Sequence, residues 1–431
     1  MIQILSINLN SDFILLILND GIMSQFDYDC IVIGGSANGA QAAFSASKSG
    51  LKVAVIEEHS KIGLPEHCSG LFSYWGLEKL DCLPPKEIVL NPDVSGSRII
   101  SPNGKILTVN KSKRHALVCD RGAFDRFLLE KATNSGVDLY LPFKATQVKK
   151  NEKSIEIGIK SNTEQMWLEA PMVISAEGIR ASITHQVGLQ GPKQDKIINA
   201  AQFYMYDLQD IDKTLVELYQ TKKFAPDFFA WLIPMSDNSA KIGLGTSRKS
   251  AAKELELMIK EHPVLRQKCE GSEIRRKTAG RIPTSGPVKR TFTNNFLMTG
   301  DVAGQTKPTT GGGVILGGIA AQIAGRVAAE AINSNNTSSR FLSKYQKLWK
   351  NEMYWNLRLM RIVRNYMDQL KDEEITSFFQ RLEDKGILQD IEEYGHVDNQ
   401  GTLVKKFMRT LSLYPFYLKT SYRLFKSVIR S

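Results

Sequence analysis

A glycine-rich turn between two apolar segments constrains the fold of this chain more than any other feature. The β-branched run Cys30–Ile33 predicts a strand that is buried on both faces. It leads into Gly34-Gly-Ser-Ala-Asn-Gly39 and then into a run of small residues over 40–49 that predicts a helix. A second apolar strand over 52–56 ends in Glu57. This order predicts a βαβ unit that binds a dinucleotide at the start of its helix.

Each position of this turn has an expected task. Gly34 permits the tight turn, and Gly39 lets the helix pack closely against the strand. Glu57 is placed to accept hydrogen bonds from a ribose. The middle glycine of the usual pattern is replaced by Ser36, which narrows the approach to a phosphate but adds a hydroxyl donor. An ordinary glycine-rich turn is the plain alternative for so degenerate a motif.

Two further segments have the chemistry of a flavin site. Asp301 ends an apolar strand, where its carboxylate can bind ribityl or ribose hydroxyls, and the triple glycine 311–313 lets a helix N-terminus approach a flavin ring and a pyrophosphate. Between the two nucleotide motifs, 120–128 predicts a capped helix that starts with Arg121, which can meet a phosphate or the flavin edge. The alternatives are a turn cap for Asp301 and a surface charge for Arg121.

Three such elements in this order resemble the p-hydroxybenzoate-hydroxylase-like class of FAD proteins. Within that class, the chain from residue 27 to about 425 resembles the geranylgeranyl reductase family. Residues 62–71, IGLPEHCSGL, resemble the family's proline-then-cysteine segment, and 226–234, PDFFAWLIP, resemble its PxxYxWxFP substrate motif. Phe229 and Ile233 replace the tyrosine and the second phenylalanine of that motif, so a tyrosine hydroxyl is absent here.

The expected architecture is α/β, with a Rossmann-type FAD-binding domain interrupted by an antiparallel β-sheet substrate domain and followed by a C-terminal helical region. The Asn-Gly pair at 103–104 predicts a hairpin, and a strand over 154–160 is assigned to the substrate sheet. The predicted boundaries are 26–190 for the first part of the FAD-binding domain, with the hairpin 97–110 inserted, 191–284 for the substrate domain, 285–336 for the second part of the FAD-binding domain and 337–431 for the helical region.

The resemblance also implies which residues contact FAD. Ala145 begins a predicted strand whose backbone amide can reach the adenine edge. The full set of implied contacts is Ser36, Asn38, Glu57, Cys68, Ser69, Leu71, Arg121, Ala145, Asp301, Gly313 and Val314.

Three residues are candidates for the chemistry itself. Cys68 can relay or donate a proton beside the flavin, although a small packing residue fits the same position. Phe229 and Trp231 can form an apolar wall for the substrate, although an aromatic cluster is more commonly core. The five cysteines are scattered without a CxxC pair, which argues against disulfides and structural zinc, so no metal is expected.

The reaction implied by the resemblance is the saturation of C=C bonds in geranylgeranyl chains, either of membrane lipids or of their diphosphate precursors. FAD delivers a hydride, while the protein supplies a dry cavity and a proton. A monooxygenase or halogenase on the same scaffold and a membrane-docked flavin electron carrier are the alternatives. The external reductant, NAD(P)H or a ferredoxin-like donor protein, and the substrate head group stay open.

The charge distribution limits the range of partners. Lys and Arg number 56 against 45 Asp and Glu, a net charge of +11, and seven of these positive charges lie in 402–431 without any carboxylate. Only 11 − 7 = +4 remains for the rest of the chain, so a nucleic-acid-binding surface is not expected. Apolar residues from Leu418 to Ile429 recur at helical spacing, each followed by a cation. This pattern fits a helix on an anionic bilayer, or a terminal helix packed on its own domain.

We expect no secretory targeting signal in the N-terminal region. The first basic residue is Lys48, and the longest apolar runs fall short of the roughly 18 residues that span a bilayer. We expect a cytoplasmic monomer that associates peripherally with membranes. Residues 1–22 precede the first predicted strand and are interpreted as an extension or a misassigned start.

Overall fold

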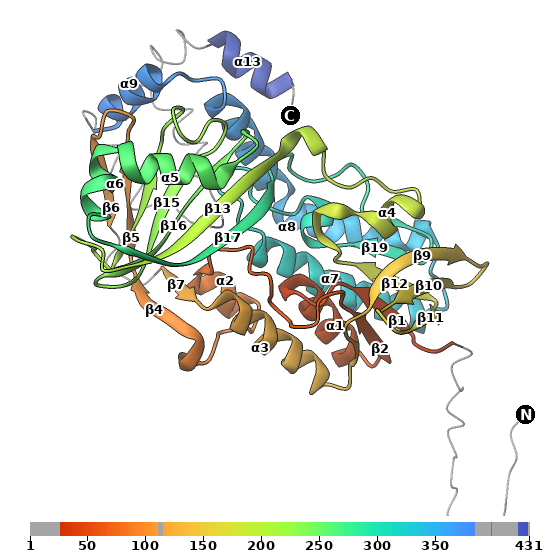
Figure 1. The fold of residues 1–431 in the computed structure, drawn as a ribbon. Helices are drawn as coiled ribbons and strands as arrows, with labels where there is room; N and C mark the ends of the chain where they lie inside the picture. Colours follow the sequence, from red (N-terminus) through yellow and green to blue (C-terminus); the bar gives the residue numbers. More distant parts are fainter. Residues whose placement is uncertain (1–25, 111–114, 384–397, 399–420, 430–431) are drawn as a thin grey trace, which may run out of the picture.

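The computed structural model describes residues 26–110, 115–383, 398 and 421–429 (Figure 1). The N-terminal extension 1–22 therefore lies outside the described residues. So does most of the basic tail, including Leu418 and Lys419.

Strand β1 (Cys30–Ile33) lies inside a six-stranded sheet of order β18-β19-β12-β1-β2-β8, which is parallel except for the β18–β19 pair. Cys30 and Val32 point to a helical layer, and Ile31 and Ile33 point to a small three-stranded antiparallel sheet. The predicted burial on both faces is confirmed. The other strands of the two sheets are β2 (Val53–Ile56), β8 (Asp138–Tyr140), β12 (Met172–Ser175), β18 (Phe292–Thr293), β19 (Phe296–Met298), β9 (Lys144–Lys150), β10 (Ile155–Lys160) and β11 (Gln165–Ala170).

The helical layer consists of α1 (Ala37–Lys48), α3 (Arg121–Thr133), α7 (Val314–Asn333) and α8 (Ser339–Met367). Helices α1 and α7 approach closely because small residues face each other: a Cβ on Gly325 would lie 2.7 Å from the carbonyl oxygen of Ala42. Helix α7 is long and apolar enough to cross a membrane, yet 72% of its most apolar window is buried in this core.

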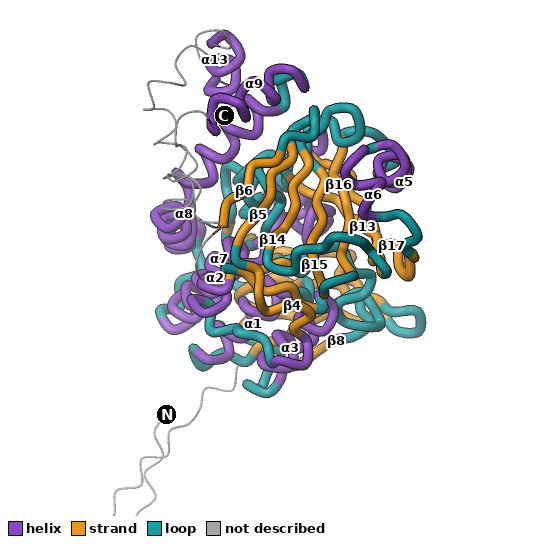
Figure 2. The backbone as a smooth tube through the Cα atoms, turned by 90° about the vertical axis from the view of Figure 1, so that its left-hand side faces the viewer, coloured by secondary structure: helices purple, strands orange, loops and turns teal. Residues whose placement is uncertain are grey.

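A second, seven-stranded sheet has the order β17-β13-β16-β15-β14-β5-β6 (Figure 2). Helices α5 (Ala251–Glu261) and α6 (Pro263–Lys268) cover one of its faces, and the other face turns toward the nucleotide-binding sheet. Its strands are β5 (Gly96–Ile100), β6 (Ile106–Asn110), β13 (Ile197–Tyr206), β14 (Leu215–Tyr219), β15 (Ala230–Ser236), β16 (Ser239–Thr246) and β17 (Glu273–Pro283).

Two details of the expected substrate sheet are wrong. The hairpin β5–β6 belongs to this sheet, and β5 pairs with β14 in parallel, so the sheet is not purely antiparallel. The segment over 154–160 is strand β10 of the separate small sheet. Alternating apolar residues predict that a strand forms, but they do not determine which strand it pairs with.

The remaining described elements join these layers. A short sheet of order β3-β7-β4 packs against the inner strands β14 and β15 of the seven-stranded sheet. At the C-terminal end, Arg423 of α13 pairs with Glu374 of α9, and Gln369 donates to Ser427 at 2.8 Å. Helix α13 is therefore packed on its own domain along this side (Figure 1). The bounds are β3 (Leu71–Ser73), β4 (Val89–Val94), β7 (Ala116–Cys119), α2 (Tyr74–Lys79), α4 (Ser182–Gln186), α9 (Asp372–Glu383) and α13 (Ser421–Ile429).

Candidate flavin and substrate site

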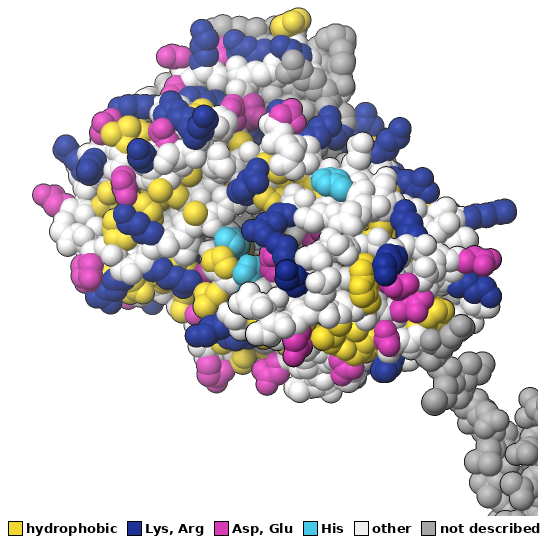
Figure 3. Space-filling view, turned by 45° about the vertical axis from the view of Figure 1, so that its right-hand side comes forward, with side chains coloured by type: hydrophobic (Ala, Val, Ile, Leu, Met, Phe, Trp, Pro, Cys, Tyr) yellow, Lys and Arg dark blue, Asp and Glu magenta, His cyan; other side chains and the backbone are white. Residues whose placement is uncertain are grey.

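A cavity of about 770 Å³ lies between the carboxyl ends of the parallel strands and the inner face of the seven-stranded sheet. Such a position is usual for ligands of open α/β sheets. On the face shown in Figure 3, histidine, lysine and arginine side chains gather around a central hollow. The sequence-predicted residues that line the cavity are Gly34, Ser36, Asn38, Glu57, Cys68, Ser69, Leu71, Arg121, Ala145, Phe229, Trp231, Asp301, Gly313 and Val314.

Gly39 is the predicted residue that does not line the cavity, and its role is in packing. A Cβ at this position would lie 1.7 Å from the carbonyl oxygen of Gly34, so the first turn of α1 accepts only glycine here. Gly34 itself has φ +102°, as the tight turn requires. The amide of Gly35 donates to Glu57 Oε2 at 2.8 Å, which holds the carboxylate at the glycine-rich turn.

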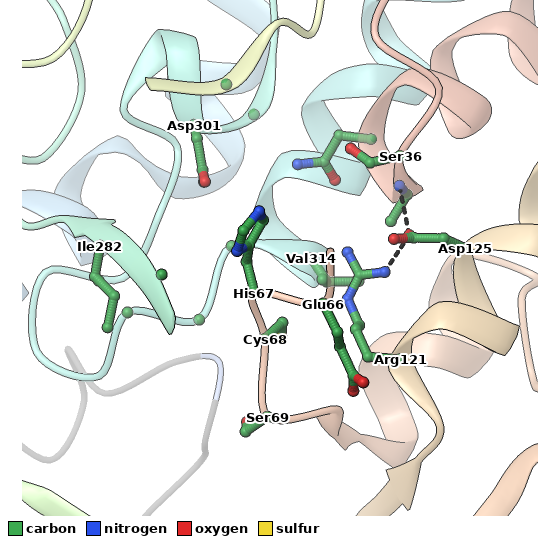
Figure 4. A pocket seen from close by; sticks show the side chains of 18 of the residues that line it. Ser36, Glu66, His67, Cys68, Ser69, Arg121, Asp125, Ile282, Asp301 and Val314 are labelled. Carbon is green, nitrogen blue, oxygen red and sulfur yellow. Dashed lines mark hydrogen bonds and ion pairs between the residues drawn. The ribbon is translucent and has the colours of Figure 1, made fainter. Parts of the chain in front are cut away.

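Arg121 and Asp125 lie at the N-terminus of α1, although they belong to α3 (Figure 4). They form an ion pair, and Asp125 Oδ1 also accepts from the amide of Ala37 at 2.8 Å. Burial alone would lower the pKa of Arg121, but the charge of Asp125 and the contact with Cys68 raise it. Burial raises the pKa of Asp125 in turn, against the opposing effect of Arg121. Arg121 therefore presents a permanent positive charge to the cavity.

The polar groups of this end of the cavity fit FAD. Arg121 Nε and Asn38 Oδ1 are buried and have no hydrogen-bond partner among the described residues. Asp301 is half-buried on the cavity wall, and removal of its carboxyl from water raises its pKa; its Oδ1 accepts from Thr306 Oγ1 at 2.6 Å. A Cβ on Gly313 would lie 2.8 Å from that Oδ1. A diphosphate matches the free guanidinium nitrogen, and ribityl or ribose hydroxyls match the oxygens of Asn38 and Asp301.

The loop that carries Cys68 is held by buried charges which the sequence did not indicate. Lys241 of β16 is fully buried, and its Nζ donates to the carbonyl oxygens of Ser69 at 2.7 Å and Cys119 at 2.9 Å. Burial lowers the pKa of Lys241, and the nearby carboxylate of Glu66 offsets part of that shift. Glu66 pairs with Arg276 at 2.7 Å and accepts from the hydroxyl of Tyr204.

The other end of the cavity is apolar. Phe229 and Trp231 lie on its wall, and the Trp231 indole donates to Gln202 Oε1 at 3.1 Å, which fixes the ring. Phe228 does not line the cavity but stacks behind Phe229, with ring centroids 4.5 Å apart. The aromatic wall continues into aliphatic side chains of β4, β7, β14 and β15, namely Val94, Ala116, Val216 and Ile233.

A further ion pair closes the cavity beside the triple glycine. Lys307 Nζ lies 2.9 Å from Asp398 Oδ1, and both side chains are buried. The carbonyl oxygen of Asp398 accepts from Asn356 of α8 at 2.7 Å. Sequence reasoning missed this pair because 91 residues separate its members.

Comparisons with known proteins agree with this geometry. Digeranylgeranylglycerophospholipid reductase 2 of Methanothermobacter thermautotrophicus is 32% identical over 370 residues, which cover 84% of this chain and 93% of the relative. The chain belongs to the digeranylgeranylglycerophospholipid reductase family. A family model described as lycopene cyclase protein also matches residues 29–389.

Solved structures place this reductase on a flavoprotein scaffold. A geranylgeranyl bacteriochlorophyll reductase-like protein from Thermoplasma acidophilum superposes with a TM-score of 0.80 at 25% identity, covering 93% of this chain and 99% of that structure. The flavin-dependent brominase Bmp2 superposes with a TM-score of 0.66 at 15% identity over 88% of this chain and 98% of that structure, a likeness of fold alone. The protein is therefore an FAD-dependent reductase, and the resemblance to geranylgeranyl reductases is confirmed.

Proposed function

We propose that this reductase saturates C=C bonds of geranylgeranyl chains carried by membrane lipids or their diphosphate precursors. One observation carries the proposal: the polar flavin end and the apolar end bounded by Phe229 and Trp231 belong to a single cavity. An isoprenoid C=C bond is apolar, so its binding requires a wall of this kind. The reductases named above supply the substrate class.

Bound FAD supplies the hydride for this reaction. The chain's own residues bind and orient the two partners: Arg121, Asn38 and Asp301 hold the cofactor, and Phe229 and Trp231 exclude water from the prenyl chain. We assign the remaining FAD contacts to Ser36, Glu57, Ser69, Leu71, Ala145, Gly313 and Val314. Cys68 lies next to Arg121 on the cavity wall, and its thiol is our candidate for the group that holds the proton.

Anaerobic turnover tests the proposed reaction. Holoenzyme reduced by dithionite, mixed with a geranylgeranylated glycerophospholipid in detergent without O₂, should yield a product heavier by two hydrogens per saturated bond. Mass spectrometry of the extracted lipid measures this increment. An enzyme that oxidises NAD(P)H only with O₂, and inserts oxygen or halogen, would instead be the monooxygenase or halogenase alternative. Reoxidation of its flavin by a redox protein without any change in the prenyl lipid would identify an electron carrier.

We also propose that the protein acts as a monomer in the cytoplasm, bound peripherally to an anionic membrane through 402–431. The described part of this tail supports a helix, α13, on which the side chain of Tyr422 is 74% exposed. Arg423 is not available to lipid because it pairs with Glu374. Removal of 402–431 should weaken sedimentation with anionic vesicles, and unchanged sedimentation would assign the tail to packing alone.

A further inference from the structure

Two exposed tryptophans lie on neighbouring helices beside the cavity. Trp75 of α2 is 58% exposed and Trp355 of α8 is 65% exposed, whereas Trp349 of α8 is fully buried. An ion pair of 3.3 Å between Lys79 and Glu352 joins the two helices at this point. Large exposed indoles are costly in water and are typical of binding surfaces.

The cationic side chains around the two rings match an anionic partner. Lys79 Nζ lies 5.4 Å from the ring centroid of Trp75, and the Arg358 guanidinium lies 5.3 Å from that of Trp355. Glu78 and Glu352 are the exposed carboxylates of this region, and Glu352 is neutralised by Lys79. Along α8, seven cations accompany this one carboxylate, at Arg340, Lys344, Lys347, Lys350, Arg358, Arg361 and Arg364. Of these, Lys344 pairs with Glu330 and Arg364 pairs with Asp368.

The same two helices lie directly behind the part of the cavity wall that holds Ile315 and Asp398. Gly76 follows Trp75, and a Cβ on it would lie 2.7 Å from Ile315 and 3.0 Å from Asp398 Oδ2. Asn356 follows Trp355 and donates to the carbonyl oxygen of Asp398 at 2.7 Å. Both Ile315 and Asp398 line the cavity. Each exposed tryptophan is thus a chain neighbour of a residue that contacts the cavity wall.

We propose that this surface, the α2–α8 face, rests on a lipid bilayer with anionic head groups and that the prenyl chain enters the cavity from the bilayer beside it. The face is defined by Trp75, Lys79, Leu348, Glu352, Trp355 and Arg358. Indole rings settle at the level of the head groups, while lysine and arginine side chains reach the phosphates. The entry route rests on the proposed function; the bilayer contact does not.

Vesicle binding tests the contact without any turnover. Holoenzyme is sedimented with vesicles of phosphatidylglycerol and phosphatidylcholine, and the W75S/W355S double variant should partition about tenfold less. Lipids brominated on their acyl chains should quench tryptophan fluorescence of the parent and lose most of that quenching in the variant. The matched control is Trp167→Ser, since Trp167 lies on β11 of the small sheet and is likewise covered by a cation, Lys149.

Two outcomes would overturn the proposal. One is unchanged vesicle partition of the double variant, including the case in which only removal of 402–431 abolishes binding. The other is a smaller apparent mass of the double variant than of the parent on size-exclusion chromatography. That result would show that the face contacts a second copy of the chain and not a bilayer. A thermal unfolding curve like that of the parent shows that each variant is folded.

Turnover then separates the entry route from the proposed reaction. The double variant should reduce detergent-dispersed prenyl lipid at the parental rate and vesicle-embedded lipid severalfold more slowly. If the double variant reduced detergent-dispersed and vesicle-embedded lipid equally slowly, entry of the prenyl chain beside this face would be refuted. Absence of reduction by the parent in either form would refute the proposed function and leave the vesicle result standing.

Discussion

Lys241 Nζ lies 2.7 Å from the carbonyl oxygen of Ser69, so a strand of the seven-stranded sheet is bonded directly to the loop that carries Cys68. The loop approaches the flavin end of the cavity, and the sheet bears the aromatic wall. The position of the Cys68 loop relative to the aromatic wall is therefore fixed by a buried lysine that does not itself line the cavity.

Replacing this lysine should loosen the Cys68 loop. In Lys241→Met, two carbonyl oxygens lose their donor, and we expect the free energy of unfolding to fall by about 2–3 kcal/mol. Alkylation of Cys68 by iodoacetamide should become severalfold faster in the folded holoenzyme. Mass spectrometry isolates this signal because Cys30, Cys82, Cys119 and Cys269 are buried.

Lys268→Met is the matched control for this substitution. Lys268 is also buried in the substrate sheet region and pairs with Glu217 at 3.2 Å, but it contacts no residue of the loop. The Lys268→Met substitution should lower the free energy of unfolding without changing the rate at which Cys68 is alkylated. Equal acceleration in both variants would show that general loosening, not the bond to Ser69, exposes the thiol.

Removing the charge of Arg121 should weaken cofactor binding. A hydrogen bond to a charged group contributes about 1.5–3 kcal/mol, so Arg121→Gln should raise the Kd for FAD about tenfold to a hundredfold. Titration of apoprotein with FAD by calorimetry measures this Kd. Arg126→Gln, an exposed position of the same helix, is the control. An unchanged Kd in Arg121→Gln would contradict the assigned phosphate contact.

Two glycines allow steric and conformational costs to be compared. Gly39→Ala places a Cβ 1.7 Å from the carbonyl oxygen of Gly34, so the variant should unfold at a much lower temperature and lose FAD. Gly50→Ala meets no atom within 4 Å but has φ +91°, so its cost should be only about 1 kcal/mol. Thermal unfolding of the two holoproteins, compared with parent, measures both effects. A mild Gly39→Ala phenotype would argue against the close contact of α1 with the turn.

The aromatic wall should affect substrate binding more than flavin binding. We expect Phe229→Ala to raise KM for the prenyl lipid severalfold with the Kd for FAD unchanged, because apolar wall is lost far from the polar end. Phe224→Ala is the control: Phe224 is buried behind the sheet and does not line the cavity. It should lose stability and keep its KM. If Phe224→Ala raised KM as much as Phe229→Ala, the effect would come from disturbance of the whole sheet and not from loss of the aromatic wall.

His262 should make stability depend on pH. Its Nδ1 accepts from the amide of Leu265 at 3.4 Å as the cap of α6, and burial lowers the pKa of its imidazole. The unfolded chain therefore binds more protons than the folded chain below the unfolded pKa of about 6.5, so stability falls as the pH drops through this value toward the folded pKa. His262→Asn keeps a capping acceptor but removes the titrating imidazole. The free energy of unfolding, measured by urea titration at a series of pH values, should therefore vary less with pH in this variant. His185→Asn, at an exposed position, should leave the profile unchanged.

The residues predicted for the flavin end, Gly39 apart, line one cavity because they belong to local motifs with strict backbone needs. The positive φ of Gly34 and the close packing of Gly39 follow from the order strand, turn, helix. Arg121 and Asp301 could be placed in the same site from their positions in the chain: Arg121 is the first residue of a helix, and Asp301 directly follows a strand. The resemblance supplied Cys68 and Trp231, whose local sequences have no independent chemical meaning.

Long-range pairs could not be predicted in this way. Lys241 sits in an alternating strand, SAKIGLG, where a lysine normally points to solvent, and only the approach of the loop around Ser69 buries it. Asp398 lies 91 residues from Lys307 along the chain, and no local pattern links the two side chains, so their ion pair could not be predicted from the sequence. Asp125 is the exception: it lies one turn after Arg121, and that spacing could have identified the pair.

The parallel pairing of β5 with β14 makes the seven-stranded sheet a poor module for recombination. Strands β5 and β6 enter the sheet before the chain has completed its nucleotide-binding layer, and the other five strands follow afterwards. An excised segment 191–284 would lose two strands and expose the edge of β14, which invites aggregation. Exchange of substrate preference between relatives therefore requires that 94–119 be exchanged together with the later segment, so the two stretches are bound to evolve as one unit.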